Sequence, residues 1–400
     1  MRELFSVVVM SLLAGWFALP TVADEIRVEV SETAGVRRTS FPVSVAVRSQ
    51  RVPLSPGNVQ VLLDGTPLAI QVDAAPSEYH RGTYLVDFHA TFVPFESRRF
   101  SIRFGDGIQG SPLPEHGHVL RETDGHFLIV NAPYLNWKIP RNLSGLLTSM
   151  NFPPCEHIRK GGAGLYLVDR TGSRIPVGGE GVHAVVLRRG PSVIHLRFSR
   201  EHSRPTGLVS QVDLIFPVTR SWVEVVHRVL DPQDLVAELG YELQLNLTPA
   251  TTKQPTLVDF GAGTQGYMTL RAGQTGQLLG GTTPNPWWKI QRSTSNRFLD
   301  LLASAPNRAA NRRAEGWAHV MDRERCLALA VDGFAETADD RITTTSAGRF
   351  QVVRSYAKGS TAPTGKQLRS WLHFVFYPPQ VSAATSPQSM QNPLTVKVVD

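Results

Sequence analysis

One C-terminal segment combines side chains that can transfer protons with a flat aromatic ring. Glu315, Trp317 and His319 alternate along it, and Arg323 follows. Alternate residues of a strand point to the same face, so a carboxylate, an indole and an imidazole would share one surface. A carboxylate and an imidazole are able to serve as general acid and base. The segment is a candidate catalytic site; the alternative is a strand edge with solvated polar groups.

A second candidate lies in the valine-rich segment 222–229. His227 falls on the face of three valines, whereas Glu224 and Arg228 fall on the opposite face. His227 therefore reads either as a core histidine or as a base. If the protein abstracts a proton next to a carboxylate, His319 or His227 would be the base, and Arg323 or Arg228 would neutralise the uronate.

Several aromatic residues stand next to polar residues in turn or strand patterns. An indole or phenol offers a flat apolar face with a polar group at its edge, which suits stacking on a sugar ring. The alternative is that these rings are ordinary core or surface aromatics. The candidate carbohydrate-binding residues are Tyr134, Trp137, Trp287, Trp288, Trp317 and His373.

Composition narrows the class of protein. The chain has 400 residues, 42% hydrophobic and 19% charged, which excludes a disordered protein and a coiled coil. The net charge of +7 is spread along the chain and no nucleic-acid-binding module is present. We therefore expect no nucleic-acid partner and a mild preference for acidic glycans.

No motif points to a cofactor or a metal. The segment Gly261-Ala-Gly-Thr-Gln-Gly266 has the spacing of a dinucleotide-binding fingerprint, but a strand pattern follows it instead of a helix. The glycine-rich segment is therefore expected to form a loop between two strands. Zinc and phosphate-loop motifs do not occur, so we expect neither cofactor nor metal.

The first 23 residues have the pattern of a secretory signal: Arg2, an apolar run, and small residues up to Ala23. An uncleaved anchor is the alternative, and either places the chain in the periplasm or outside the cell. No later stretch is apolar enough to cross a membrane. In such a compartment Cys155 and Cys326 either form a disulfide or remain two buried free thiols.

Short alternating segments rich in valine, isoleucine, leucine and phenylalanine fill the rest of the chain, separated by turn residues. They predict an all-β fold. We expect a small β domain over residues 24–115, a large antiparallel β-sandwich over 120–380, and a C-terminal tail over 381–400 that is either an ordered strap or disordered.

Two regions carry a family resemblance. The segment 28–43, with Gly35-Val-Arg-Arg38 leading to Pro42-Val, resembles the start of RIFT-like barrels. The segment 127–147 and the strand pair 211–217 and 222–225 resemble galactose-mutarotase-like supersandwich domains. Together they resemble the non-helical parts of exported rhamnogalacturonan exolyase-type polysaccharide lyases. Such lyases also carry a large helical catalytic domain, which this chain lacks, so no catalytic residue is carried over.

The resemblance implies a barrel followed by a supersandwich and a carbohydrate context. Our leading hypothesis is an exported protein that binds or processes a polysaccharide or oligosaccharide, by a lyase-like reaction if it is catalytic. The competing hypothesis is a non-catalytic envelope or matrix protein that mediates assembly with other proteins. It predicts buried tryptophans at positions 287, 288 and 317, and no cleft that gathers histidine and arginine.

Overall fold

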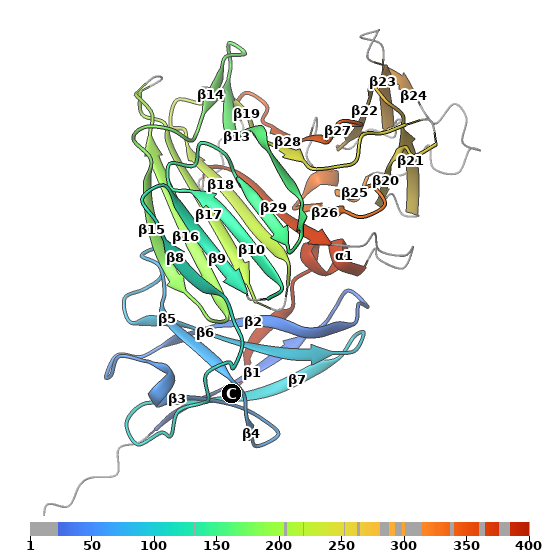
Figure 1. The fold of residues 1–400 in the computed structure, drawn as a ribbon. Helices are drawn as coiled ribbons and strands as arrows, with labels where there is room; N and C mark the ends of the chain where they lie inside the picture. The colour runs from blue at the N-terminus through green and yellow to red at the C-terminus, as the bar shows by residue number, and fades with distance from the viewer. Residues whose placement is uncertain are drawn as a thin grey trace, which may run out of the picture.

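The protein is almost entirely β-structure, as the sequence predicts, and its two parts stack on each other (Figure 1). The computed structural model describes residues 23–399, except 132, 204–205, 219, 252, 262–264, 281–287, 293–297, 301–313, 337–339, 360–364 and 376–384. In Figure 1 the N-terminal domain, coloured blue to cyan, lies below the sandwich. No helix in the described part of the chain is long and apolar enough to cross a membrane.

Two sheets form the N-terminal domain, in the orders β30-β1-β7-β3-β4 and β2-β6-β5. Valine and phenylalanine alternate with polar residues along their strands, so one face of each sheet is buried in a shared core. The elements of this domain are β1 (Asp24–Ser31), β2 (Arg38–Arg48), the 3₁₀ turn η1 (Pro56–Asn58), β3 (Val59–Leu63), β4 (Thr66–Pro67), β5 (Ile70–Ala74), β6 (Thr83–Phe92), β7 (Ser97–Phe104) and β30 (Thr395–Val399).

Three antiparallel sheets form the large domain. A five-stranded sheet has the order β12-β11-β10-β9-β8, and an eight-stranded sheet has the order β14-β13-β19-β28-β27-β22-β23-β24. Their strands are β8 (Val119–Glu122), β9 (His126–Asn131), β10 (Leu135–Pro140), β11 (Ser149–Phe152), β12 (Cys155–Glu156), β13 (Ile158–Asp169), β14 (Arg174–Pro176), β19 (Val236–Leu245), β22 (Gln274–Leu279), β23 (Trp288–Arg292), β24 (Phe298–Asp300), β27 (Arg341–Thr345) and β28 (Arg349–Ser355).

The third sheet has nine strands in the order β15-β16-β17-β18-β29-β26-β25-β20-β21. It is the sheet that carries the candidate site. Its strands are β15 (His183–Arg189), β16 (Val193–Glu201), β17 (Val209–Pro217), β18 (Trp222–Leu230), β20 (Thr256–Gly261), β21 (Gln265–Leu270), β25 (Trp317–Met321), β26 (Cys326–Val331) and β29 (Lys366–Val375). A 3₁₀ turn, η3 (Phe334–Glu336), follows β26.

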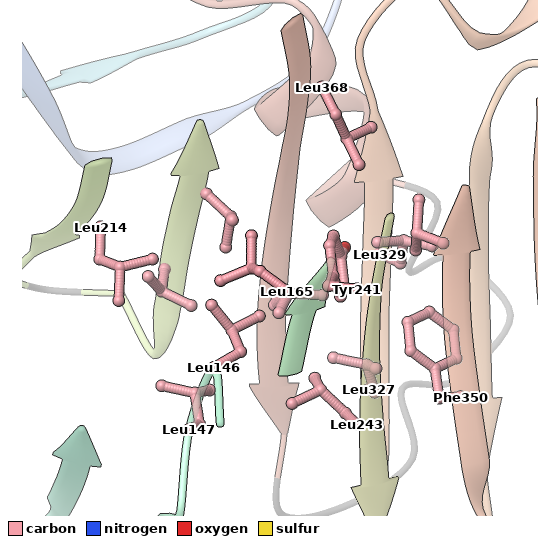
Figure 2. Close-up of a cluster of buried hydrophobic side chains, with 14 of the residues drawn as sticks. Leu146, Leu147, Leu165, Leu214, Tyr241, Leu243, Leu327, Leu329, Phe350 and Leu368 are labelled. Carbon is pink, nitrogen blue, oxygen red and sulfur yellow. The ribbon is translucent and has the colours of Figure 1, made fainter. Parts of the chain in front are cut away.

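One continuous hydrophobic core joins these three sheets. Figure 2 shows leucines from several strands meeting there, among them Leu214 of the nine-stranded sheet and Leu165 of the eight-stranded sheet. The one polar group in the labelled set, the Tyr241 hydroxyl, lies 3.0 Å from the hydroxyl of Ser370 on the facing sheet. Its hydrogen bond offsets the cost of burying that oxygen.

The C-terminal residues belong to both domains and do not form a separate tail. The short helix α1 (Thr385–Gln391) packs against β25, β26 and β29 of the nine-stranded sheet. The strand β30 then pairs antiparallel with β1, from Arg27 opposite Val399 to Ser31 opposite Thr395. The first and last strands of the described chain are therefore neighbours in one sheet.

The glycine-rich segment 261–266 connects two paired strands, as the sequence predicts. The strands β20 and β21, on either side of the glycine-rich segment, pair antiparallel, so that segment joins two strands and opens no helix. Cys155 and Cys326 are both buried free thiols, the second of the two alternatives that the sequence left open. Burial raises the pKa of the Cys326 thiol well above its ordinary value, so it is protonated at neutral pH.

A buried ion pair joins the N-terminal domain to α1. Arg38 and Glu32 have fully buried side chains 3.1 Å apart. The carboxylate of Glu32 also accepts hydrogen bonds from four backbone N–H groups, those of residues 34, 35, 36 and 95. Arg38 in turn donates to the carbonyl oxygens of Ser389, at 2.8 Å, and Asn392. The pair thus holds the end of α1 in place.

We expect Glu32→Gln to lower the free energy of unfolding by about 3 kcal/mol, since it leaves the buried guanidinium of Arg38 without its counter-charge. Urea unfolding followed by tryptophan fluorescence measures the change. The matched control is Glu29→Gln, which breaks the exposed pair with Arg99 and should cost less than about 1 kcal/mol. Equal losses in the two variants would contradict a structural role for the buried pair.

Candidate functional site

The nine-stranded sheet has one apolar and one polar face. On β18, Val223, Val225 and His227 point into the core, whereas Glu224 and Arg228 point to the other side and line a groove. The strand pairing continues this pattern, because Glu224 is opposite Trp371 of β29 and Val226 is opposite Arg369. The period of two along each strand therefore collects the polar side chains on the face turned toward the N-terminal domain.

A groove of about 520 Å³ lies between this face, the N-terminal domain and the C-terminal segment. Its volume is within the range of roughly 300–1,000 Å³ that is usual for small-ligand sites. The groove collects four basic and four acidic side chains together with one imidazole. They are Arg188, Arg197, Arg228, Arg369, Glu78, Asp87, Asp213, Glu224 and His195.

Asp213, in the middle of β17, is the centre of the charge network. Its carboxylate accepts hydrogen bonds from Arg197, at 2.7 and 3.2 Å, and from Arg228, at 2.6 Å. The Nε2 atom of His195 lies 3.0 Å from the same carboxylate. Burial opposes ionisation of Asp213, but the hydrogen bonds from His195 and Arg197 outweigh it and hold its pKa well below the usual range. Asp213 is therefore ionised at neutral pH.

Ion pairs across the groove connect the two domains. Arg197 of the sandwich contacts both oxygens of Glu78 in the N-terminal domain, at 2.9 and 2.6 Å. The hydrogen bond to Glu78, with those to Asp213, raises the pKa of Arg197. A second ion pair between the domains joins Arg188 of β15 to Asp87 of β6, and both side chains are buried. These contacts hold the groove walls at a fixed separation.

Aromatic rings form the rest of the lining. Phe41 and Trp222 pack edge to face with ring centroids 5.6 Å apart, and the guanidinium of Arg369 lies 4.7 Å from the ring centre of Trp371. Both tryptophans are almost buried and belong to one small hydrophobic cluster with Met390 of α1. Tyr79 differs because it is 45% exposed at the groove. It is the lining aromatic most available for stacking.

The sequence interpretation missed His195 and Asp213. Both lie in short apolar segments of the kind that predicts strands, and within each segment polar residues alternate with apolar ones: His195 and Arg197 on β16, and Gln211 and Asp213 on β17. That pattern identifies a polar face on each strand. It does not show that two polar faces meet under another domain, which depends on the long-range pairing.

The predicted catalytic segment 315–323 lies on the same face but outside the groove lining. His319 is 1% exposed, and its Nδ1 atom lies 2.6 Å from Asp259. The indole of Trp317, 2% exposed, donates to the carboxylate of Glu315 at 2.8 Å. The helix α1 packs over this strand and leaves Trp317 and His319 buried, whereas Glu315 is half-buried and Arg323 is exposed in the turn after β25.

His227 does not have the position that a base would need. It is fully buried among valines, and neither ring nitrogen has a hydrogen-bond partner among the described residues. Burial lowers its pKa to about 3, so the ring is neutral at physiological pH. Of the two alternatives that the sequence left open, His227 is therefore the core histidine. Arg228, on the opposite face, does line the groove.

The predicted sugar-binding aromatics lie in different places. Trp137 is fully buried and packs against Phe216 and Phe374, so it is a core residue and cannot contact a sugar. Tyr134 is 68% exposed but does not line the groove. His373 packs edge to face on Trp222, and burial lowers its pKa to about 3. Position 287 and the side chain of Trp288 lie outside the described residues.

Comparisons with known proteins show the fold. No protein-family model and no curated protein sequence matches the chain. A solved structure of a protein in glycosyl hydrolase family 38 from Enterococcus faecalis is similar, with a TM-score of 0.55 and 11% identity over 94% of this chain and 47% of that chain. An α-mannosidase from Enterococcus faecalis V583 has a TM-score of 0.53 and 12% identity over 94% and 46%.

A putative aldose 1-epimerase from Escherichia coli K12 has a TM-score of 0.34 and 11% identity over 65% of this chain and 99% of that chain. This chain spans about half the length of the two Enterococcus structures. At such identities the two likenesses above 0.5 show a shared β-rich fold. The specific resemblance to rhamnogalacturonan lyases stays a prediction from the sequence.

We expect Asp213→Asn to lower the free energy of unfolding at pH 7 by about 3 kcal/mol, because Arg197 and Arg228 lose the buried carboxylate that pairs with both. The loss should shrink as the pH falls below about 4. The low pKa of Asp213 in the folded state adds stability above its unfolded value near 3.9, and protonation removes that stability in acid.

Urea unfolding of wild type and variant between pH 2 and 7 measures this dependence. Asp106→Asn, at an exposed turn position, is the control and should unfold like wild type throughout. A difference between Asp213→Asn and wild type that does not change with pH would show that the carboxylate is not the source of the stability.

Proposed function

We propose that the protein binds a glycan in the groove between its N-terminal domain and the nine-stranded sheet. The observation that carries the proposal is the lining: charged hydrogen-bonding groups from β16, β17, β18 and β29 stand beside aromatic rings in one concavity. Sugar hydroxyls need several fixed donors and acceptors, and sugar rings need a flat apolar surface. Arg228, Arg369 and Tyr79, whose side chains are partly exposed at the groove, are the lining residues best placed to supply these contacts.

The competing assembly hypothesis required that no cleft gather histidine and arginine. The groove does gather His195 with four arginines, which favours the glycan hypothesis. One feature of the assembly hypothesis does hold, because Trp317 is buried. Its burial has a local cause in the packing of α1, so it does not speak against a groove elsewhere on the same face.

The glycan hydrolases among the similar structures support a carbohydrate context, although only their fold is shared. Export through the N-terminal signal and a lyase-like reaction remain predictions from the sequence. The two histidines predicted as bases, His319 and His227, do not line the groove. We therefore propose binding as the function of the groove.

Replacing Tyr79 tests this proposal. We expect Tyr79→Ala to weaken the binding of a glycan found on an oligosaccharide array about tenfold, which corresponds to about 1.4 kcal/mol, because the sugar ring loses its exposed stacking partner. Isothermal titration calorimetry measures the change. Tyr134→Ala is the matched control, since Tyr134 is an exposed tyrosine outside the groove. If Tyr134→Ala weakens binding and Tyr79→Ala does not, the site is not the groove.

A further inference from the structure

Two arginines of the groove lie next to each other on neighbouring strands. Arg369 of β29 is opposite Val226 of β18, and Arg228 is opposite Gln367. Arg228 and Arg369 are therefore diagonal neighbours on one face of the sheet. The distance between such positions is about 7–8 Å, which long side chains are able to bridge.

Neither guanidinium uses all of its donors within the protein. Arg369 donates through Nε to Glu224, at 2.7 Å, and its two terminal nitrogens have no hydrogen-bond partner among the described residues. Arg228 donates through Nε to Gln367, at 3.0 Å, and through Nη1 to Asp213, at 2.6 Å, which leaves Nη2. Three terminal nitrogens thus remain available on this pair.

Arg197, in the same groove, shows the opposite case. Its three nitrogens all donate, Nε and Nη2 to Asp213 and both terminal nitrogens to Glu78. Exposure follows the same division, since the side chain of Arg197 is 14% exposed whereas those of Arg228 and Arg369 are 39% and 34% exposed. Arg197 therefore has a structural role, whereas Arg228 and Arg369 have donors left for a ligand.

The attraction of this pair for an anion does not come from net charge. Four arginines and four carboxylates line the groove, so their formal charges cancel. The carboxylates are already engaged: Glu78 by Arg197, Asp87 by Arg188, Glu224 by Arg369, and Asp213 by its three partners. What remains is the planar fork of two terminal nitrogens on Arg369, which lies beside Trp371, together with Nη2 of Arg228. Such a fork matches two oxygens of a carboxylate or a sulfate.

We propose that Arg228 and Arg369 form an anion subsite that takes the acidic group of a glycan, a uronate carboxylate or a sulfate ester. The inference rests on the proposed function and names the substrate class of the same groove. In it, Arg369 binds the acidic group through its terminal nitrogens while Glu224 fixes the guanidinium through Nε. Trp371 supports the guanidinium from one side.

The test compares oligosaccharides with and without their negative charges. A galacturonate hexamer and its fully methyl-esterified form have the same rings and length, and a sulfated galactan hexamer with its desulfated form provides the second pair. We expect wild type to bind at least one acidic form ten times more tightly than its neutral form. The pair that shows the difference assigns the group as carboxylate or sulfate.

The variants locate that preference. Arg369→Gln should reduce the tenfold preference to less than twofold, and Arg369→Lys should retain part of it, because lysine keeps the charge but lacks the planar fork. Arg228→Lys serves as a second variant at the partner position. Arg99→Gln, an exposed arginine of the N-terminal domain, is the control and should bind like wild type. Circular dichroism verifies that each variant is folded.

The anion subsite and the proposed function are overturned by different results. Equal binding of acidic and neutral forms, or an acidic preference that survives Arg369→Gln in a folded protein, overturns the anion subsite and leaves glycan binding in place. If wild type binds none of these oligosaccharides and none on a broad array, the proposed function itself falls, and the subsite falls with it.

Discussion

Other parts of the protein pack against both faces of the nine-stranded sheet, and this packing determines where the sheet is able to offer a binding site. One face is buried in the sandwich core, with Leu214, Val225 and Leu368 among its residues. The other carries charged and aromatic side chains, and the N-terminal domain and α1 pack over it. A polar face under a second domain is stable only if its charges are paired. The groove is the part of that face where the covering elements stop short.

Asp213 shows how the pairing serves both stability and a site. From β17 it holds His195 and Arg197 of β16 and Arg228 of β18 together, and Arg197 extends the network to Glu78 across the domain boundary. A charged side chain whose hydrogen bonds are all made within the protein is held rigidly and has no donor or acceptor left for a ligand. The surplus donors of Arg228 and Arg369, whose side chains are 39% and 34% exposed, are the ones that a ligand in the groove can reach.

The fold class follows from short-range patterns, and the site does not. Alternation along 223–229 separates a core face from a polar face correctly, and the same rule places His227 in the core and Arg228 in the groove. The pattern does not reveal that Glu78 and Asp87 of another domain approach this face, because strand pairing and domain packing join residues about 120 positions apart. Trp317 and His319 share a face as expected, but α1, which has a weak helical pattern of its own, covers them. Residues 395–399 were predicted only as part of a C-terminal tail, because the pairing of this segment with β1 joins the two ends of the described chain.

The pairing of β30 with β1 has a consequence for the order in which the chain folds. Residues 24–31 are synthesised first, but the sheet that they belong to lacks its edge strand until residues 395–399 are made. The sandwich, whose strands lie between these segments, is then complete in sequence before the N-terminal domain is. Contacts that span nearly the whole chain are slow to form, since the loop between them must close first. Assembly of the first domain, and with it the anchoring of α1 by Arg38, is thus a late event in the formation of the groove.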